Sequence, residues 1–424
     1  MVKDKAIGSN YYWTCESRKS LYCKGRAVSK LTNGRHELTK FVEHNHSPLI
    51  SAVHISKVMD NIKRQAKESS DLPCQIIQQC TTSVSPHVAA VMPSIEAIRQ
   101  RIRRVRHGQR PAEPRTLAGI CVPDVMRVTF SGELFLIKDK RVGNDGFLMF
   151  TTVSDLQKLE SASFWIMDGT FKTVPKIFYQ LYTIHAPVLR GSYRTFPFVY
   201  ILMTGKSRSL YESVFEELLT FCEENGLALN PSMVLTDFEL GAINACKSVF
   251  PNARNKACYF HFAHCIWRQV QNSGLAKRYC RDEEFNLKIR QLSALAFLPA
   301  EEIPDAFDLL KLHMPDEARQ ITEWFESNYV RGRIRKRLRN GVVVRAPTLF
   351  PPELWSTYDC MQEGFPRSQN SVEAWHRRWE SLIGGSHVGV YRMIEEFRRE
   401  RLQTQYGLRS LKLSLMTAQV DHAF

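Results

Sequence analysis

The sequence lacks any uninterrupted apolar run near the roughly 20 residues that a membrane-spanning helix needs. Its start, MVKDKAIGSNYYWTC, also lacks the apolar core of a secretory signal. Acidic residues are not in excess, because 58 Lys and Arg stand against 43 Asp and Glu, a formal charge of +15. These absences predict a soluble intracellular protein, with no membrane segment and with a polyanionic partner, nucleic acid ahead of an acidic membrane surface.

A secreted disulfide framework is also missing. The eleven cysteines are odd in number and scattered over 424 residues, so we expect metal ligands and reduced core thiols. The chain shows no solenoid-type repeat and no extended low-complexity tract. Its length and apolar content predict two or three compact units with sizeable cores.

The first half of the chain changes character several times. Residues 10–46 read as short aromatic strands with an Asn-Gly turn, a sheet whose core is too small to be stable alone. Residues 51–115 read as a basic connecting region with at least one helix, in which Ile95, Ile98, Ile102 and Val105 recur at helical spacing. DVMRVTF, LFLIKDKRV and GFLMFTTV read as strands, the last two joined by a hairpin at residues 143–146.

From residue 161 onward, strands alternate with helices. FWIMDGTF, FYQLYTIHA and FPFVYILMTGK are three successive apolar runs of strand length, and helix and strand then alternate up to residue 270. This order predicts an α/β fold with a mixed sheet. Residues 271–345 look mostly helical, and residues 371–383 and 387–405 are predicted helices, the last docking on the core through Val390, Ile394 and Phe397.

A zinc signal lies inside the small aromatic sheet. Cys15, Cys23, His44 and His46 have the spacing C-x7-C-x20-H-x-H, and two thiolates with two imidazoles suit tetrahedral zinc in a closed structural site. In the alternative interpretation no metal binds: the two cysteines are buried thiols of the core, and the segment HNH is a polar turn. The opening YYWTC and the closing EHNH resemble the FLYWCH-type zinc finger, which implies a zinc-stapled, DNA-binding sheet. Only ten residues precede YYWTC, so we expect a finger shortened at its N-terminal side.

Three acidic residues lie at the ends of predicted strands or at the start of a predicted helix, positions that hold a side chain rigidly. Asp168 in FWIMDGTFK and Asp237 in SMVLTDFELGA each follow an apolar strand, and Glu373 lies in the first turn of a late helix. Such oxygen ligands can hold Mg²⁺ or Mn²⁺ for phosphodiester chemistry. Each has a simpler alternative, in which Asp168 begins an Asp-Gly turn, Asp237 caps helix 239–249, and Glu373 forms a capping box with Asn370.

The motifs DGTFK, LTDFE, CYFH and NSVEAWHRR, in this order, resemble a Mutator-like element (MULE) transposase domain over about residues 120–385. The resemblance implies an RNase H-like fold that cuts and joins DNA with a DDE triad of Asp168, Asp237 and Glu373. It also implies a supporting role for Cys258 and His261. From the residues alone, CYFHFAHC is compatible with a metal cluster that includes His264 and Cys265, or with a buried thiol beside a histidine that starts a helix.

Two basic runs, RQRIRRVR and RGRIRKRLR, could neutralise several phosphates without sequence choice, or serve as nuclear import addresses. We therefore expect a nuclear protein. The second run supplies the DNA-contact candidates Arg331, Arg333, Arg335, Lys336, Arg337 and Arg339.

These observations predict a five-part chain. It comprises a FLYWCH-type finger (1–50), a basic helical linker (51–115), an RNase H-like core with the first two acids (116–270), a helical insertion (271–355) and a closing part of the core with the third acid (356–424). The predicted function is a DNA transposase with structural zinc and catalytic Mg²⁺ or Mn²⁺, acting on transposon ends and target DNA. A homo-oligomer is compatible with the sequence but not selected by it.

Two other classes of protein remain open. One is a transposon-derived DNA-binding or chromatin regulatory protein that keeps the fold without nuclease activity. The other is a zinc-stapled protein-interaction module on an inert scaffold, for which strong duplex DNA binding at moderate salt would be absent.

Overall fold

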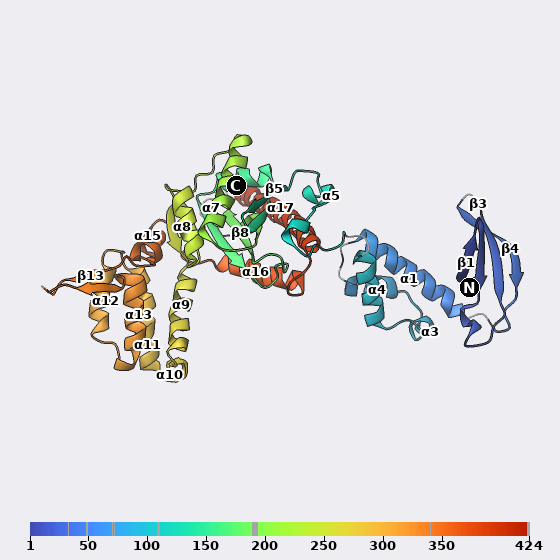
Figure 1. The fold of residues 1–424 in the computed structure, drawn as a ribbon, viewed down its shortest axis with the longest axis horizontal. Helices are drawn as coiled ribbons and strands as arrows, with labels where there is room; N and C mark the ends of the chain where they lie inside the picture. The colour runs from blue at the N-terminus through green and yellow to red at the C-terminus, as the bar shows by residue number, and fades with distance from the viewer. Residues whose placement is uncertain are drawn as a thin grey trace. The chain divides into compact units, whose positions relative to one another are not determined.

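The computed structural model describes residues 1–32, 34–47, 50–69, 71, 73–107, 111–188, 194–339 and 341–421. It divides into two compact units, Met1–Pro111 and Ala112–Phe424 (Figure 1). None of its described helices is both long enough and apolar enough to cross a membrane.

The first unit begins with a four-stranded antiparallel sheet in the order β1-β2-β3-β4, formed by β1 (Val2–Ile7), β2 (Asn10–Thr14), β3 (Arg26–Thr32) and β4 (Arg35–Val42). Strand β1 occupies the few residues that precede YYWTC. Gly34 follows β3 at φ +76°, as a tight hairpin turn requires, and Asn33 of the predicted Asn-Gly turn lies outside the described residues. Every residue of β4 is exposed, so this sheet has the small core that the sequence indicated.

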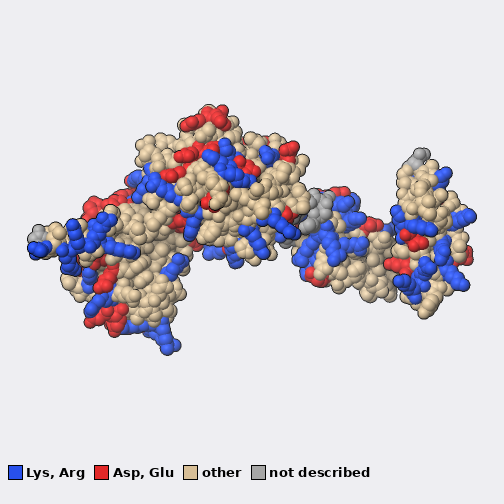
Figure 2. Space-filling view, in the orientation of Figure 1, with Lys and Arg blue, Asp and Glu red and all other residues tan. Residues whose placement is uncertain are grey.

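The rest of the first unit consists of α1 (Ile50–Glu68), α2 (Pro73–Thr81), α3 (Pro86–Ala89) and α4 (Ile95–His107). The sequence predicted a connecting region with at least one basic helix, whereas these helices pack around a core of their own. That core contains Met59, Ile62, Ala66, Ile76, Ile77, Cys80, Ile98 and Ile102. Lys and Arg side chains gather over this part of the chain on the face that Figure 2 shows.

The second unit is built on a seven-stranded mixed sheet in the order β11-β10-β7-β8-β9-β6-β5. Strands β5 to β9 pair antiparallel, and β10 runs parallel to both β7 and β11. The bounds are β5 (Leu136–Val142), β6 (Asp145–Phe150), β7 (Phe164–Thr170), β8 (Gln180–Pro187), β9 (Thr195–Met203), β10 (Met233–Thr236) and β11 (Arg254–Ala257). This arrangement confirms the predicted α/β fold class with a mixed sheet, and β5 and β6 form the predicted hairpin.

Helices cover both faces of this sheet (Figure 1). On one face, α6 (Val153–Glu160), α7 (Arg208–Glu224) and α8 (Leu240–Val249) pack in a core that includes Trp165 and Met167 of β7. On the other face, α16 (Asn370–Ile383) and α17 (Val390–Asp421) bury Trp375, Trp379 and Phe397. The predicted docking of the last long helix on the core is therefore confirmed. The prediction of a strand at DVMRVTF is wrong, because Pro123 precedes a short helix, α5 (Asp124–Arg127), and only Val128 forms a bridge.

A helical insertion follows β11. It contains α9 (Tyr259–Asn272), α10 (Ala276–Arg281), α11 (Glu283–Ala294), α12 (Ile303–Lys311), α13 (Arg319–Phe325) and a π-helical turn (Glu326–Val330). Its core closes on Trp355 of α14 (Pro352–Trp355), whose ring stacks on Phe262 with centroids 4.5 Å apart. The short helix α15 (Tyr358–Gln362) then leads back to the sheet.

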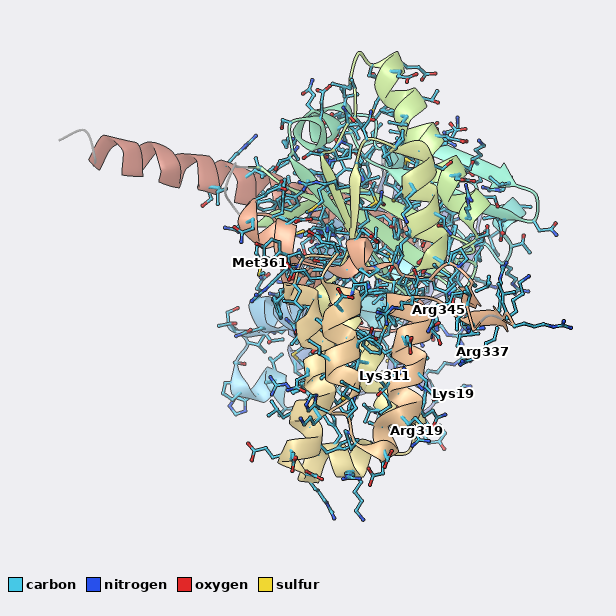
Figure 3. The ribbon with its side chains drawn as sticks, turned by 90° about the vertical axis from the view of Figure 1, so that its left-hand side faces the viewer. Lys19, Lys311, Arg319, Arg337, Arg345 and Met361 are labelled. Carbon is cyan, nitrogen blue, oxygen red and sulfur yellow. The ribbon has the colours of Figure 1, made fainter. Side chains whose placement is uncertain are left out.

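The run RGRIRKRLR is not part of a helix. It supplies the strand β12 (Ile334–Arg337), which pairs antiparallel with β13 (Val343–Arg345) in a two-stranded hairpin, and all of β12 is exposed. In Figure 3, Arg337 lies on the outer part of this hairpin and Arg345 lies nearer the helices. Alternating basic and apolar residues suit a strand better than a helix face, which explains why the helical prediction fails here.

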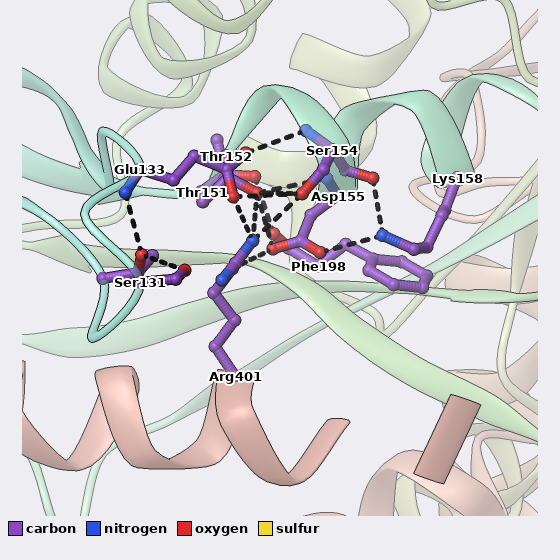
Figure 4. A network of polar contacts seen from close by, with 10 residues as sticks. Ser131, Glu133, Thr151, Thr152, Ser154, Asp155, Lys158, Phe198 and Arg401 are labelled. Carbon is purple, nitrogen blue, oxygen red and sulfur yellow. Dashed lines mark hydrogen bonds and ion pairs between the residues drawn. The ribbon is translucent and has the colours of Figure 1, made fainter. Parts of the chain in front are cut away.

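A buried ionic network fixes α17 to the sheet (Figure 4). The Arg401 side chain, 4% exposed, donates to Asp155 Oδ2 and Glu133 Oε2, both at 2.6 Å, and also to Thr152 and Ser154 at the start of α6. Burial by itself would raise the pKa of Glu133, but the Ser154 N–H and the Arg401 charge hold it below its ordinary value.

We expect Arg401→Ala to lower the free energy of unfolding of the second unit by about 3–5 kcal/mol. The substitution removes the buried guanidinium that pairs with Glu133 and Asp155, and of the two carboxylates only Asp155 keeps another cation among the described residues, Lys158. Urea unfolding followed by tryptophan fluorescence measures this change. Arg409→Ala, at an exposed position of the same helix, serves as the control and should change stability by less than about 0.5 kcal/mol. Equal effects of the two substitutions would contradict a structural role for the network.

Candidate functional site

The predicted zinc ligands come together at the end of the small sheet. Cys15 follows β2, Cys23 precedes β3, and the two histidines follow β4, so loops at one end of the strands present all four. Their candidate ligand atoms all lie within 4.8 Å of one another. Cys15 Sγ is 3.2 Å from His46 Nε2, and Cys23 Sγ is 3.4 Å from His44 Nδ1. Such separations fit four ligands around one tetrahedral ion with Zn–S near 2.3 Å and Zn–N near 2.0 Å.

The surroundings of the cluster orient its ligands. The Gly25 N–H donates to Cys23 Sγ at 3.3 Å, and His46 Nδ1 lies 3.0 Å from the Ser47 carbonyl oxygen, which leaves Nε2 for a metal. A Cβ at Gly25 would lie 2.9 Å from His44 Nδ1, so the close approach of His44 requires glycine there. Cys15 and Cys23 are both buried, and both are free thiols that face these histidines.

In the second unit, Asp168 and Asp237 lie on the neighbouring strands β7 and β10. Asp168 lies inside β7, where it pairs with Thr183 of β8, so it does not begin an Asp-Gly turn. Asp237 directly follows β10, and its Oδ1 accepts a hydrogen bond from the Glu239 N–H at 3.1 Å. The residue that starts α8 as its N-cap is Glu239. Burial and then the negative charge of Asp168 raise the pKa of Asp237. The parallel pairing of β7 with β10 places the two acidic residues on neighbouring strands.

Glu373 projects from the first turn of α16. Its helix is capped by the backbone of Gln369, without a side-chain capping bond, so a capping box with Asn370 is not formed. Within the described part of the chain, the Glu373 carboxylate has no hydrogen bond or ion pair. Asp168, Asp237 and Glu373 do not form a group within 4.8 Å, a criterion that only the Cys/His cluster meets among the described residues.

Two residues that the sequence did not single out connect α16 to the acidic strands. The Gln369 side chain is fully buried, and its Nε2 donates to the carbonyl oxygens of Met167 and Leu235, both at 3.3 Å. His376 Nε2 lies 3.2 Å from Asp168 Oδ2, although not in hydrogen-bond alignment. Because Glu373 lies four residues after Gln369 and three before His376, it shares their helix face. The i, i+3 spacing of Glu373 and His376 is the signal by which His376 could have been found.

Cys258 and His261 lie beside the acidic pair. Cys258 is buried, and its Sγ accepts from the Gln369 N–H at 3.3 Å. Burial alone would lower the pKa of His261, but the Cys258 sulfur and the charges of Asp168 and Asp237 raise it to about 9. Because this value is above neutral pH, the imidazole carries a positive charge there. His264 and Cys265 join no metal-ligand group among the described residues, so a second metal cluster finds no support.

The glycine of DGTFK has a packing role. A Cβ at Gly169 would lie 2.6 Å from Gln180 Oε1, a buried side chain whose Nε2 donates to Tyr211 at 2.6 Å. This glycine therefore leaves room for the Gln180 side chain of the neighbouring strand β8.

The fold and these two sites define the class: an α/β chain with a Cys₂His₂ metal centre on a small sheet and paired acids on neighbouring strands of a larger one. Residues 164–265 match the MULE transposase domain, and residues 1–46 match the FLYWCH zinc finger domain. The two matches cover about a third of the 424 residues. Comparison with curated proteins gives no match. The predicted resemblances are thus confirmed, and they support a transposase-like, DNA-binding protein with a structural zinc site.

Proposed function

We propose that this protein is a metal-dependent DNA transposase of the Mutator-like type, which cleaves DNA and joins the freed end to a target. The observation that carries the proposal is the position of Asp168 and Asp237 on the paired parallel strands β7 and β10, inside the segment that matches the MULE transposase domain. The order of three antiparallel strands followed by two strands parallel to the first supports the RNase H-like fold that the resemblance implies. Residues 116–270 and 356–424 then form the catalytic core.

The residues around the acidic pair fit a divalent cation. Asp168 and Asp237 are hard oxygen ligands whose mutual repulsion a cation would relieve, and Glu239 Oε1 is buried without a hydrogen-bond partner in the described structure. Glu373 would complete the set from α16. In a two-metal site the two ions lie about 3.5–4 Å apart. Carboxylates that bind on opposite sides of such a pair are therefore farther from one another than the four ligands of a single zinc ion. Mg²⁺ or Mn²⁺ bound there would activate the attacking oxygen and stabilise the leaving oxygen.

The other side chains of the site position the helix that carries Glu373 and supply positive charge near the two aspartates. Gln369 ties α16, the helix that carries Glu373, to β7 and β10. His261, charged near neutral pH, and Lys206, which lowers the pKa of Asp237, place positive charge where a scissile phosphate would approach. His376 Nε2 contacts the Asp168 carboxylate at 3.2 Å.

A cleavage assay on end-labelled duplex tests the proposal, with Mg²⁺ or Mn²⁺ added against a chelator control. We expect cation-dependent strand cleavage and, with a supplied end sequence, joined products. If the protein binds DNA but yields no cation-dependent product, the second candidate holds. That candidate is a transposon-derived DNA-binding or chromatin protein without nuclease activity. It is favoured by the fact that the three acids do not form a tight ligand group in this structure.

The β12–β13 hairpin is the proposed DNA-contacting arm. Arg333, Arg335, Lys336, Arg337 and Arg339 are exposed and have no ion pair among the described residues. Arg331, also predicted to contact DNA, instead holds both oxygens of Asp308 at 2.6 and 2.7 Å. We therefore propose phosphate contacts for five of the six predicted residues, and a nuclear location follows from the DNA substrate.

We expect the double substitution Arg335→Ala and Arg337→Ala to weaken binding to duplex DNA uniformly across sequences. Each lost phosphate contact should reduce the slope of log affinity against log salt by about 0.9, or about 2 in total. Fluorescence anisotropy over a salt series measures the slope. Arg331→Ala should leave the slope unchanged, because that guanidinium is already neutralised by Asp308; a slope that falls equally in both variants would refute the assignment.

A further inference from the structure

Residues 50–107, here called the helical module, lie between the two matched segments and belong to neither. Helix α1 supplies Met59, Ile62 and Ala66 to the core of this module, and α2 and α4 supply the other five buried residues. The module is therefore a packed structure rather than an extended linker. It carries nine Lys and Arg against four Asp and Glu.

The arginines of α4 divide into three groups by their contacts. Arg106 is structural, because its guanidinium donates to the carbonyl oxygens of Ala66, Ser69 and Asp71 at 3.1, 2.9 and 2.7 Å. These bonds satisfy carbonyls at and just beyond the C-terminal end of α1 and hold α4 against it. Arg99 and Arg103 lie near the Glu96 carboxylate, at 3.5 and 4.0 Å.

Arg101 and Arg104 form the third group. Both are exposed and have no ion pair among the described residues. With Ala97 and Gln100 they occupy positions i, i+3, i+4 and i+7, so the four side chains share one face of α4. The buried Ile98 and Ile102 lie on another face, toward α1 and α2. The outward face of α4 thus presents two unpaired guanidiniums, one carboxamide and one small side chain.

We propose that the helical module is a second duplex-DNA-binding domain, which lays α4 in the major groove with Gln100, Arg101 and Arg104 toward base edges. The major groove accepts an α-helix, and there Arg binds guanine and Gln binds adenine through paired hydrogen bonds. Ala97 is small enough to allow close approach and can contact a thymine methyl group. This proposal adds sequence readout to the phosphate contacts assigned to the hairpin, and it does not depend on cleavage activity.

The composition of the face favours duplex DNA over other polyanions. No large apolar side chain stands among Ala97, Gln100, Arg101 and Arg104, whereas binding to a membrane surface needs apolar side chains that enter it. A protein partner would need an aromatic or aliphatic anchor on this face. The major groove of duplex RNA is too deep and narrow to admit a helix.

The full-length protein tests this proposal in two measurements. Selection from a random-sequence duplex DNA pool gives the preferred sequence, and anisotropy gives the affinity for it and for an unrelated duplex. We expect the double substitution Arg101→Ala and Arg104→Ala to weaken binding to the selected duplex at least about tenfold and to abolish its preference over the unrelated one. The matched control, Arg99→Ala with Arg103→Ala, removes the same charge from the same helix and should change affinity less than about threefold.

Circular dichroism shows whether the alanine variant is less stable than the wild type. If it is, the charge-preserving double substitution Arg101→Lys and Arg104→Lys provides a second test. The lysine ammonium lacks the rigid planar fork of the guanidinium, so this variant should keep affinity for the unrelated duplex and lose most of the preference. Equal weakening by the two alanine pairs would overturn the proposal, as would unchanged preference in the lysine variant. Binding of duplex RNA or anionic vesicles as tight as that of the selected DNA would also overturn it. Asp168→Asn protein should show the same selected sequence, which separates this outcome from any failure of cleavage.

Discussion

Replacement of Asp168 by asparagine is expected to reduce cation-dependent cleavage by at least about a thousandfold while DNA affinity stays within about twofold of the wild type. The carboxylate is buried beside Asp237, and a neutral amide cannot provide the charge that a divalent cation requires. A thousandfold loss corresponds to about 4 kcal/mol of transition-state stabilisation. Single-turnover cleavage of labelled duplex measures the rate, and anisotropy measures binding.

Helix α16 offers a matched control for the third carboxylate. Glu373→Gln should lose activity to a similar extent, whereas Glu380→Gln, two turns further along the same helix, should cleave at the wild-type rate. The Glu380 carboxylate pairs with Lys172 at 2.7 Å and is not part of the acidic pair. Wild-type cleavage by Asp168→Asn protein would sink the catalytic assignment. Equal losses in the Glu373 and Glu380 variants would remove Glu373 from the site.

Loss of a zinc ligand should unfold the small sheet. We expect Cys15→Ser to reduce bound zinc from one ion per chain toward none and to abolish amide hydrogen-exchange protection in β1 to β4. The reason is that structural zinc contributes about 10–16 kcal/mol in small fingers, while this sheet buries few side chains. Metal analysis after desalting and exchange mass spectrometry on the full chain measure the two effects.

An exposed cysteine elsewhere in the first unit provides the comparison. Cys74→Ser, on α2, should keep one zinc per chain and normal protection in the sheet. Chelator treatment of the wild-type protein should reproduce the Cys15→Ser exchange pattern. One zinc ion retained in Cys15→Ser protein, with protected amides in β2 and β3, would show that the cluster does not hold the metal.

Residues with strong local signals were predictable. The Cys and His ligands of the small sheet were identified because two cysteines followed by a His-x-His pair are typical of a metal site. The strands that carry Asp168 and Asp237 were identified because buried strands leave continuous apolar runs. Val390, Ile394 and Phe397 were assigned to the docking face of the last long helix from their helical spacing, and all three are buried.

Other features depended on partners distant in sequence. Gln369 links α16 to two strand carbonyls more than 100 residues away, and nothing in the local pattern SQNSVE distinguishes this glutamine from an exposed one. In the sequence, Arg331 cannot be distinguished from the other basic residues of its run. Only the structure shows that its charge is neutralised by Asp308. The module of α1 to α4 was read as a linker because its composition is basic, and each of three helices supplies only two or three residues to a core that forms when the helices meet.

The sequence by itself determined the types of chemistry available to this chain: a soft four-ligand metal set, rigid carboxylates after apolar strands, and a strong positive charge. Only the tertiary structure decided which groups meet, which cations are already paired, and which helix face is left for a ligand. The physical reason is that local periodicity sets the secondary structure, whereas burial and charge pairing depend on contacts between residues far apart along the chain.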